Sequence, residues 1–205
     1  MNGVGNGTVL SNIVLTHGDD DAIEFFGGTV NASNILVINC TDDMFDFSQG
    51  YRGTVKNVYG IREAGYTAVT ADPRGIEADG NLDGKTPNDI NQSDFTVDGI
   101  TIVNNAPGKD ANLTMHDVFK IRRGAKATIK NAFAKFGAGT TAVDLIDFND
   151  DRGAGDAAST IEYTIDPANG LGDAKIKNPG NAKIEKKDGL KGADVSAFSW
   201  TGYKF

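Results

Sequence analysis

Acidic side chains gather in two short segments of the sequence, at residues 19–24 and 42–46. The acids are Asp19, Asp20, Asp21, Glu24, Asp42, Asp43 and Asp46. Carboxylate oxygens at this density are the ligands that Ca²⁺ prefers, and two close carboxyl groups also supply the acid and the base of glycoside hydrolysis. The pattern therefore offers two chemistries, cation binding and carboxylate catalysis.

Three sets of candidate residues follow from this pattern. The candidate ligands of a Ca²⁺ ion are Asp19, Asp20, Asp21, Asp42 and Asp43. The candidate catalytic residues, for the case of an enzyme, are Asp20, Asp21, Glu24, Asp42, Asp43 and Asp46. The candidate ligand-binding residues are Glu24, Asp46, Glu77, Tyr51 and Arg52. Aspartate at a tight turn also caps its own backbone, so a purely structural role for these acids stays open.

The sharpest enzymatic interpretation is a polygalacturonase-type glycosidase, because Gly18-Asp19-Asp20 resembles the G-D-D motif of that family. The family also carries G-H-G and R-I-K motifs, and neither occurs here; Lys120-Ile121-Arg122 reverses the order of the third motif. A lyase would instead need an Arg or Lys base beside Ca²⁺ ligands. The candidates for that base are Arg52, Arg62 and Arg74.

The segments that hold these acids belong to a repeat of about 21 to 25 residues, the length of one coil of a β-solenoid. Asp20–Phe25 recurs as Asp42–Phe47, and Ser11–Ile13 recurs as Ser33–Ile35. A triplet also recurs, as Gly7-Thr8-Val9, Gly28-Thr29-Val30 and Gly53-Thr54-Val55. With fainter later copies, we predict about five coils over residues 7–148 and an insertion near 62–92.

Each copy contains short strands with alternating apolar positions, separated by Gly, Asn or Asp. A sandwich or barrel of hairpins also has short strands. Only a solenoid, however, needs the same residue at the same position in each coil, because each coil stacks on the next. The repeated identities therefore favour an all-β fold, a parallel β-helix.

The segments His17–Val37 and Asp42–Val55 resemble a group of secreted bacterial right-handed β-helix proteins with the pectate-lyase-like fold, often mislabelled as multidrug transporters. The resemblance covers residues 7–136 and implies a right-handed solenoid and a secreted or cell-surface location. Phe45, Phe47 and Tyr51 stand where members commonly have a Trp-containing coil. The predicted fold is thus a right-handed parallel β-helix of about five to six coils. Residues 1–148 are its coils, and residues 149–205 are a last partial coil with a C-terminal docking segment of the same domain.

Alternation along the acid-bearing strand decides which side chains face inward. The predicted inward residues are Ile23, Phe25, Phe45, Phe47, Ile76, Ala78, Phe119, Ile121, Val143 and Leu145. The predicted outward residues, one per coil, are Glu24, Asp46, Glu77, Lys120 and Asp144. Because coils lie about 4.8 Å apart, neighbouring carboxylates of this row share a proton, hold a cation between them or stay solvated.

Composition excludes several classes of protein. The net charge is −8, with 20 Lys and Arg against 28 Asp and Glu, which argues against nucleic-acid binding. No segment approaches the roughly 20 apolar residues of a membrane-spanning helix. The single cysteine, Cys40, excludes an intrachain disulfide framework and a zinc site built from cysteines.

The other repeated strand is apolar on both faces, which predicts a cover for its outer side. If Ile13 and Leu15 point inward, the outward apolar residues are Val14, Leu36, Ile38 and Tyr59, and the reverse assignment leaves the others exposed. The insertion, the tail or a partner can supply the cover. The tail ends in Phe198, Trp200, Tyr203 and Phe205, and aromatic residues at a terminus favour docking over disorder.

The repeat already runs at Gly7, so we expect little chain to remain for a cap on the first coil. We predict either a fragment of a longer secreted protein or self-association through the N-terminal coil. The apolar residues concerned are Val4, Val9, Leu10, Ile13 and Leu15. The predicted function is a secreted or cell-surface binding or structural module with polysaccharide as its ligand, and the alternative is a carbohydrate-active enzyme, a lyase or glycosidase.

Overall fold

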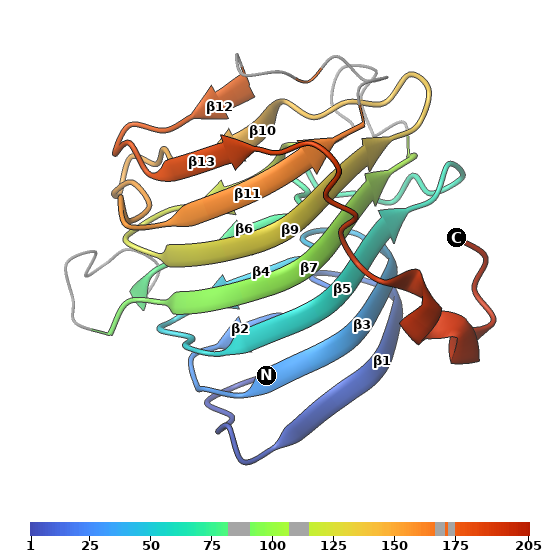
Figure 1. Cartoon of the computed structure of the whole chain (residues 1–205), viewed down its shortest axis with the longest axis horizontal. Coiled ribbons are helices and arrows are strands. Elements are labelled where there is room, and N and C mark those ends of the chain that lie inside the picture. Colours follow the sequence, from blue (N-terminus) through green and yellow to red (C-terminus); the bar gives the residue numbers. More distant parts are fainter. Residues whose placement is uncertain (82–90, 107–114, 167–170, 172–174) are drawn as a thin grey trace.

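The strands of the protein form two parallel sheets that alternate along the chain (Figure 1). The computed structural model describes residues 1–81, 91–106, 115–166, 171 and 175–205. The long sheet contains, in spatial order, β1 (Val9–Gly18), β3 (Asn31–Cys40), β5 (Thr54–Arg62), β7 (Asp94–Asn104), β9 (Lys126–Phe136), β11 (Thr160–Ile165) and β13 (Lys183–Lys186). The short sheet contains β2 (Glu24–Phe26), β4 (Phe45–Ser48), β6 (Ile76–Ala78), β8 (Asp117–Ile121), β10 (Asp144–Asp147) and β12 (Ile176–Lys177).

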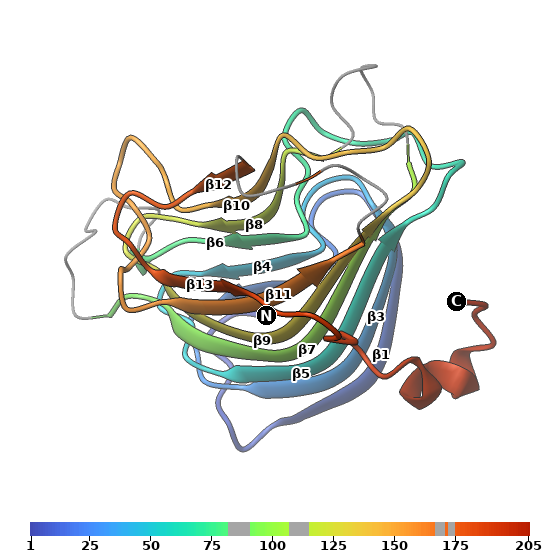
Figure 2. The ribbon, with the colours of Figure 1, turned by 45° about the horizontal axis from the view of Figure 1, so that its top comes forward.

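Each long strand is followed by a short strand, and each such pair stacks on the pair before it, as Figure 2 shows. The predicted parallel β-helix is therefore confirmed. Beyond residue 148, β11 and β12 form a further pair, and the short strand β13 is the last strand of the long sheet. Strand β6 lies inside the predicted insertion at 62–92, of which residues 82–90 are outside the described residues.

The register of the strands matches most of the repeats in the sequence. Ser11 pairs with Ser33, Ile13 with Ile35, and Phe25 with Phe47, as predicted. The Gly-Thr-Val triplets are an exception, since Val9 pairs with Asn31 and Val55 pairs with Ala32. The turns that precede these strands differ in length from coil to coil, so the similar triplets are out of register and do not pair with one another.

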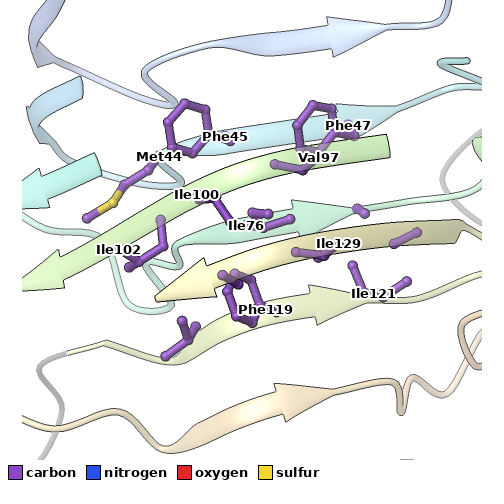
Figure 3. Close-up of a cluster of buried hydrophobic side chains, with 14 of the residues drawn as sticks. Met44, Phe45, Phe47, Ile76, Val97, Ile100, Ile102, Phe119, Ile121 and Ile129 are labelled. Atoms are coloured by element: carbon purple, nitrogen blue, oxygen red, sulfur yellow. The ribbon is translucent and has the colours of Figure 1, made fainter. Parts of the chain in front are cut away.

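Aromatic rings stack inside the first coils. The Phe25 and Phe47 rings lie 5.4 Å apart at 14°, which confirms the predicted stack. Phe47 also stacks on Phe95 at 4.3 Å. Farther along, Phe47, Ile76 and Phe119 of the short sheet face Val97 and Ile129 of the long sheet across the core (Figure 3).

Asparagines bend the long strands at the same place in successive coils. Asn12, Asn34 and Asn57 have φ values of 57°, 55° and 54°, in the left-handed region that asparagine tolerates. Their side chains form a ladder, in which Asn34 donates to Asn12 Oδ1 at 3.0 Å and Asn57 donates to Asn34 Oδ1 at 2.8 Å. The ladder thus links the bends of the first three long strands through side-chain hydrogen bonds.

The C-terminal residues 190–205, here called the strap, cross the outer face of the long sheet from β9 toward β1 (Figures 1 and 2). The strap includes the 3₁₀ helix η4 (Val195–Thr201). Phe198 is 0% exposed and packs in a cluster with Leu36 and Val103 of the sheet. The backbone N–H of Gly192 donates to Asn131 of β9, and that of Asp194 donates to the ladder asparagine Asn57. The expected cover of the outer apolar face is thus the strap.

The first residues of the chain cover one edge of the first coil, contrary to the expectation that little chain remains for a cap. Gly3 N donates to Phe26 O at 2.9 Å, and Thr29 N donates to Val4 O at 2.8 Å. These bonds pair residues 1–4 with the segment around β2, while β1 stays at the edge of the long sheet. Within the part of the chain that the structure describes, no helix has the length and apolar character needed to cross a membrane.

Candidate functional site

A row of charged side chains runs along the outer face of the short sheet, one per strand. Pairing of the strands places Glu24 beside Asp46, Asp46 beside Glu77, and Glu77 beside Lys120, as predicted. The next member is Asp147, because Asp147 and not Asp144 pairs with Lys120. The prediction of Asp144 was wrong by three residues.

A second row precedes the first by three residues in each coil. It consists of Asp21, Asp43, Arg74, Asp117 and Asp144. Asp144 pairs with Asp117. Asp43 N donates to Asp21 Oδ1 at 3.0 Å, and Arg74 N donates to Asp43 Oδ1 at 2.8 Å. In the first three coils, a backbone N–H of one coil thus binds the carboxylate of the coil before it. These bonds fix the positions of Asp21 and Asp43.

The outward row is buried from Asp46 onward, although Glu24 is half-exposed, so of the predicted alternatives the fully solvated row does not hold. Asp46, Glu77, Lys120 and Asp147 are 7%, 8%, 7% and 3% exposed. The reason is that charged side chains of neighbouring coils lie over one another and pair. From the third coil onward, opposite charges alternate between the strands, so the row needs no water to compensate it.

Arginines and lysines neutralise the acids of the later coils. Arg74 Nη1 lies 2.6 Å from Glu77 Oε1, and Arg74 Nε lies 3.0 Å from Asp117 Oδ2. Lys120 Nζ lies 2.7 Å from Asp147 Oδ2. Further pairs join Arg122 to Glu77 and Asp79, Arg123 to Asp150, and Lys177 to Asp144. Sequence reasoning missed most of these pairs. Only Arg74, three residues before Glu77, has an offset from the first row that the chain itself made visible.

The acids of the first two coils form a cluster with much less compensation, here called the acidic patch. It comprises Asp20, Asp21, Glu24, Asp42, Asp43 and Asp46. Carboxylate oxygens lie within 4.8 Å of one another in three triads, Asp20–Asp21–Asp42, Asp21–Glu24–Asp46 and Asp43–Asp46–Glu77. Among the described residues, only Asp43 of the patch has an ion pair, with Arg74 at 3.8 Å.

Asp46 lies at the centre of the acidic patch, since it belongs to two of the three triads. Its Oδ1 is buried and has no hydrogen-bond partner among the described residues. Burial is the main cause that raises the pKa of Asp46 well above its usual range, and Glu77, Asp21 and Glu24 raise it further. A buried carboxylate without a counter-ion is costly, so a cation or a proton is favoured at this position.

The neighbours of Asp46 show the same tendency. Burial, followed by the charges of Asp42 and Glu24, raises the pKa of Asp21 to about 7. Burial also raises the pKa values of Glu24, Asp42 and Asp43. Several carboxyl groups that resist ionisation together favour either a shared proton or a bound cation.

The donor set of the acidic patch fits a hard cation such as Ca²⁺, which takes oxygen ligands from carboxylates. Asp21, Glu24 and Asp46 converge, and the orphaned Oδ1 of Asp46 supplies a buried ligand atom. Of the predicted metal ligands, Asp20, Asp21 and Asp42 also converge, and Asp43 lies with Asp46. Asp19 is exposed and belongs to none of the triads of described residues.

Two predicted ligand-binding residues lie elsewhere. Tyr51 is 0% exposed, its ring packs 4.7 Å from that of Phe25, and its hydroxyl donates to Val30 O at 2.7 Å inside the core. Tyr51 is therefore a core residue, and its assignment to a binding site was wrong. Arg52 lies at the turn before β5, and its Nε donates to Gln92 O at 3.3 Å.

The arginines proposed as a catalytic base are held by other groups. Arg74 touches four carboxylates and is 5% exposed, and those acids, Glu77 first among them, outweigh its burial and raise its pKa further. A guanidinium in that setting stays protonated and serves as a counter-ion. Arg62 is 0% exposed and donates to the carbonyl oxygens of Cys40 and Asp42, which holds the turn that presents Asp42 and Asp43.

Comparison with known proteins agrees with this architecture. The family model described as the pectate-lyase-like beta helix domain matches residues 1–189. No curated protein and no solved structure matches the chain. The match spans the strands of both sheets and the whole acidic patch, and it ends just before the strap. The chain therefore belongs to the family of pectate-lyase-like beta helix domains.

Proposed function

We propose that the protein is a secreted or cell-surface β-helix module that binds an acidic polysaccharide through a cation held in the acidic patch. Membership of the family indicates a carbohydrate-related or structural β-helix protein. The observation that supports binding is Asp46, a buried carboxylate at the meeting point of two acidic triads whose Oδ1 has no partner among the described residues. Carboxylates on a rigid sheet provide a site that exists before the ligand arrives.

Asp21, Glu24 and Asp46 would hold the Ca²⁺ ion, and the ion would supply positive charge for the carboxylates of a uronate chain. Asp21 and Glu24 are half-exposed, whereas Asp46 is buried beneath them. The patch is thus open to solvent on its outer side. Its own charge repels an acidic polymer, so binding of that ligand requires the cation.

The test compares thermal unfolding and polyuronate binding in EDTA and in millimolar Ca²⁺. We expect Ca²⁺ to raise the melting temperature of the wild-type protein, because a ligand that binds only the folded state stabilises it. Asp46→Asn should abolish this rise and the Ca²⁺-dependent retention of polygalacturonate. Asp98→Asn is the matched control, since it removes the same charge from an exposed position on the long sheet. Equal melting curves in EDTA and Ca²⁺ would reduce the acidic patch to structural turns.

One observation favours a second candidate function, hydrolysis or elimination of a polysaccharide. Asp21 is half-exposed with a pKa of about 7, while neighbouring acids differ in burial. A carboxyl group that is half protonated near neutral pH suits general acid catalysis. Release of reducing ends or of unsaturated products from a polysaccharide panel, lost in Asp21→Asn, would support the enzyme. Binding without any product would exclude it for those substrates.

A further inference from the structure

The outer face of the long sheet carries a row of threonines on four neighbouring strands. Thr54 of β5 pairs with Thr96 of β7, Thr96 with Thr128 of β9, and Thr128 with Thr160 of β11. All four are half-exposed, and the residues that follow them point into the core. Strands β5, β7, β9 and β11 lie side by side in Figure 1. The row therefore presents one hydroxyl group per coil.

These hydroxyl groups make no polar contact of their own with the part of the chain that the structure describes. None of the four threonine side chains has a hydrogen bond with another described residue, and none has an interaction of another kind. The asparagines and Thr101 on the same face are, by contrast, bound to the strap. The strap thus covers the half of the sheet toward the strand ends and leaves the threonine half uncovered.

The rows beside the threonines alternate in charge from strand to strand. Lys56 pairs with Asp98 and Asp98 with Lys130 on one side. On the other side Lys126 Nζ lies 3.2 Å from Asp94 Oδ2. Positive and negative side chains therefore compensate one another along both borders. Such a face has no net charge with which to attract a charged polymer, whereas the acidic patch on the short sheet attracts cations and repels anions.

A groove of about 500 Å³ continues this face toward the first coil. Its lining includes Ser11, Ser33, Thr54 and Lys56, which come from β1, β3 and β5. Val9, Leu10 and Ala32 also line the groove. Ser11 pairs with Ser33 and Ser33 with Lys56, so the two serines continue the row of Lys56 and not the row of threonines. The row of threonine hydroxyl groups thus spans β5 to β11.

We infer that this threonine face is a binding site for a neutral polysaccharide chain that runs across the strands. The spacing between strands is about 4.8 Å, close to the length of one sugar residue in a linear chain, so successive sugars can meet successive hydroxyl groups. Each hydrogen bond is weak, but a rigid row repeats it for every coil, and the repetition gives useful affinity. Because the Lys and Asp charges cancel, the face offers no net positive charge to attract a uronate, and the net charge of −8 of the chain disfavours an anionic polymer, so a neutral polymer is the ligand expected here. This inference does not depend on the acidic patch or on a cation.

The experiment is native gel electrophoresis of the full chain in EDTA, with gels that contain a β-1,4-glucan, a β-1,3-glucan, an α-1,4-glucan or a galactomannan. We expect at least one of these neutral polymers to retard the wild-type protein. The variant Thr96→Val/Thr128→Val removes two hydroxyl groups and keeps the shape and the strand preference of the side chains. Its affinity should fall about tenfold, since two weak hydrogen bonds are lost.

Two controls separate this site from others. Thr16→Val changes an exposed threonine of the same sheet outside the row, and Asp46→Asn changes the acidic patch. Both variants should be retarded like the wild type. Unchanged retardation of the double variant, retardation that needs Ca²⁺, or absence of retardation by all four neutral polymers would each overturn the inference. A polyuronate that binds only with Ca²⁺ tests the acidic patch separately, so failure of one site is distinguishable from failure of the other.

Discussion

Asp46 and Lys120 occupy equivalent positions of one row on the short sheet, yet their surroundings are opposite. Lys120 Nζ lies 2.7 Å from Asp147 Oδ2, whereas Asp46 has neighbouring carboxylates and no ion pair with a described residue. Both side chains are 7% exposed, so burial alone does not separate them. The difference lies in the sign of the neighbouring charges, and it marks the first two coils as the place where an external cation or a proton is favoured.

The raised pKa values of the acidic patch predict how stability depends on pH. Burial raises the pKa of Asp21 from 3.8 to about 7, so between these values the folded state binds more protons than the unfolded state. Stability in EDTA should therefore fall as the pH rises from about 4 to about 7. Urea unfolding in EDTA at several pH values measures this change in the free energy of unfolding.

The same titration contains a control, because Asp117 and Asp150 have lowered pKa values. Ionisation of these two groups stabilises the folded protein, and this contribution is lost only at more acidic pH. With Ca²⁺ present, the loss of stability near neutral pH should shrink. A free energy of unfolding that stays constant or rises from pH 5 to pH 7.5 in EDTA would contradict the burial of these acids.

Phe47 is the residue at which the register of the core is most easily tested. Its ring contacts those of Phe25, Tyr51 and Phe95, and the side chain is 1% exposed. Phe47→Ala should therefore destabilise the protein by about 3–5 kcal/mol, because a large cavity opens between coils. Tyr51→Phe, which removes only the hydroxyl bond to Val30, should cost about 1 kcal/mol. Chemical denaturation of both variants gives the comparison.

At the scale of elements, the strap ties several coils together from outside. Its backbone bonds reach Asn131 on β9, Thr101 on β7 and Asn57 on β5, and Tyr203 donates to Glu63 Oε1 at 3.0 Å beyond the end of β5. Phe198 sits in the apolar cluster that these contacts frame. The strap thus binds strands that do not follow one another in the chain.

Removal of the buried ring should show how much the strap stabilises the coils. Phe198→Ala is expected to cost about 3–5 kcal/mol, since the side chain is fully buried. Trp200→Ala is the matched control on the same helix, because Trp200 is 56% exposed and its loss should change stability by about 0.5 kcal/mol or less. Similar melting curves for Phe198→Ala and wild type would mean that the strap does not dock in solution.

The elements that repeat residue for residue were predictable, and those that depend on partners were not. Phe25 and Phe47, or Glu24 and Asp46, recur at one spacing, so their pairing follows from the sequence. Asp144 and Asp147 lie three residues apart with similar neighbours, so periodicity could not choose between them. The burial of Glu77 could not be predicted either, because Arg74 and Arg122 reach it from other coils.

The whole molecule is electrically uneven. Its net charge is −8, and the later coils of the short sheet pair their acids with Arg74, Lys120, Arg122 and Lys177. The acidic patch on the first two coils has little such compensation among the described residues. Among the described residues, uncompensated negative charge is thus concentrated on the first two coils of the short sheet, while the threonine face on the other sheet is compensated. The two proposed sites therefore favour ligands of different charge.

The two ends of the stack differ in their capacity to pair with another chain. Strand β1 spans ten residues at the edge of the long sheet, and Val9 on it is 88% exposed. Leu10, Ile13 and Leu15 of β1 are only partly buried. Strand β13 at the other edge has four residues and includes Lys183 and Lys186, which protect an edge. We therefore propose that two copies associate through their β1 strands.

Pairing of one β1 with another β1 uses the same surface twice and closes after two copies, so the expected product is a dimer and not a fibre. Light scattering over a concentration series should show a mass that rises from 21.6 kDa toward twice that value. Val9→Lys places a charge on the edge and should shift the protein toward the monomer. Val195→Lys, at a residue of the strap that is 40% exposed, should leave the association unchanged. A mass that stays at 21.6 kDa at every concentration would show that residues 1–4 and the strap already protect the first coil.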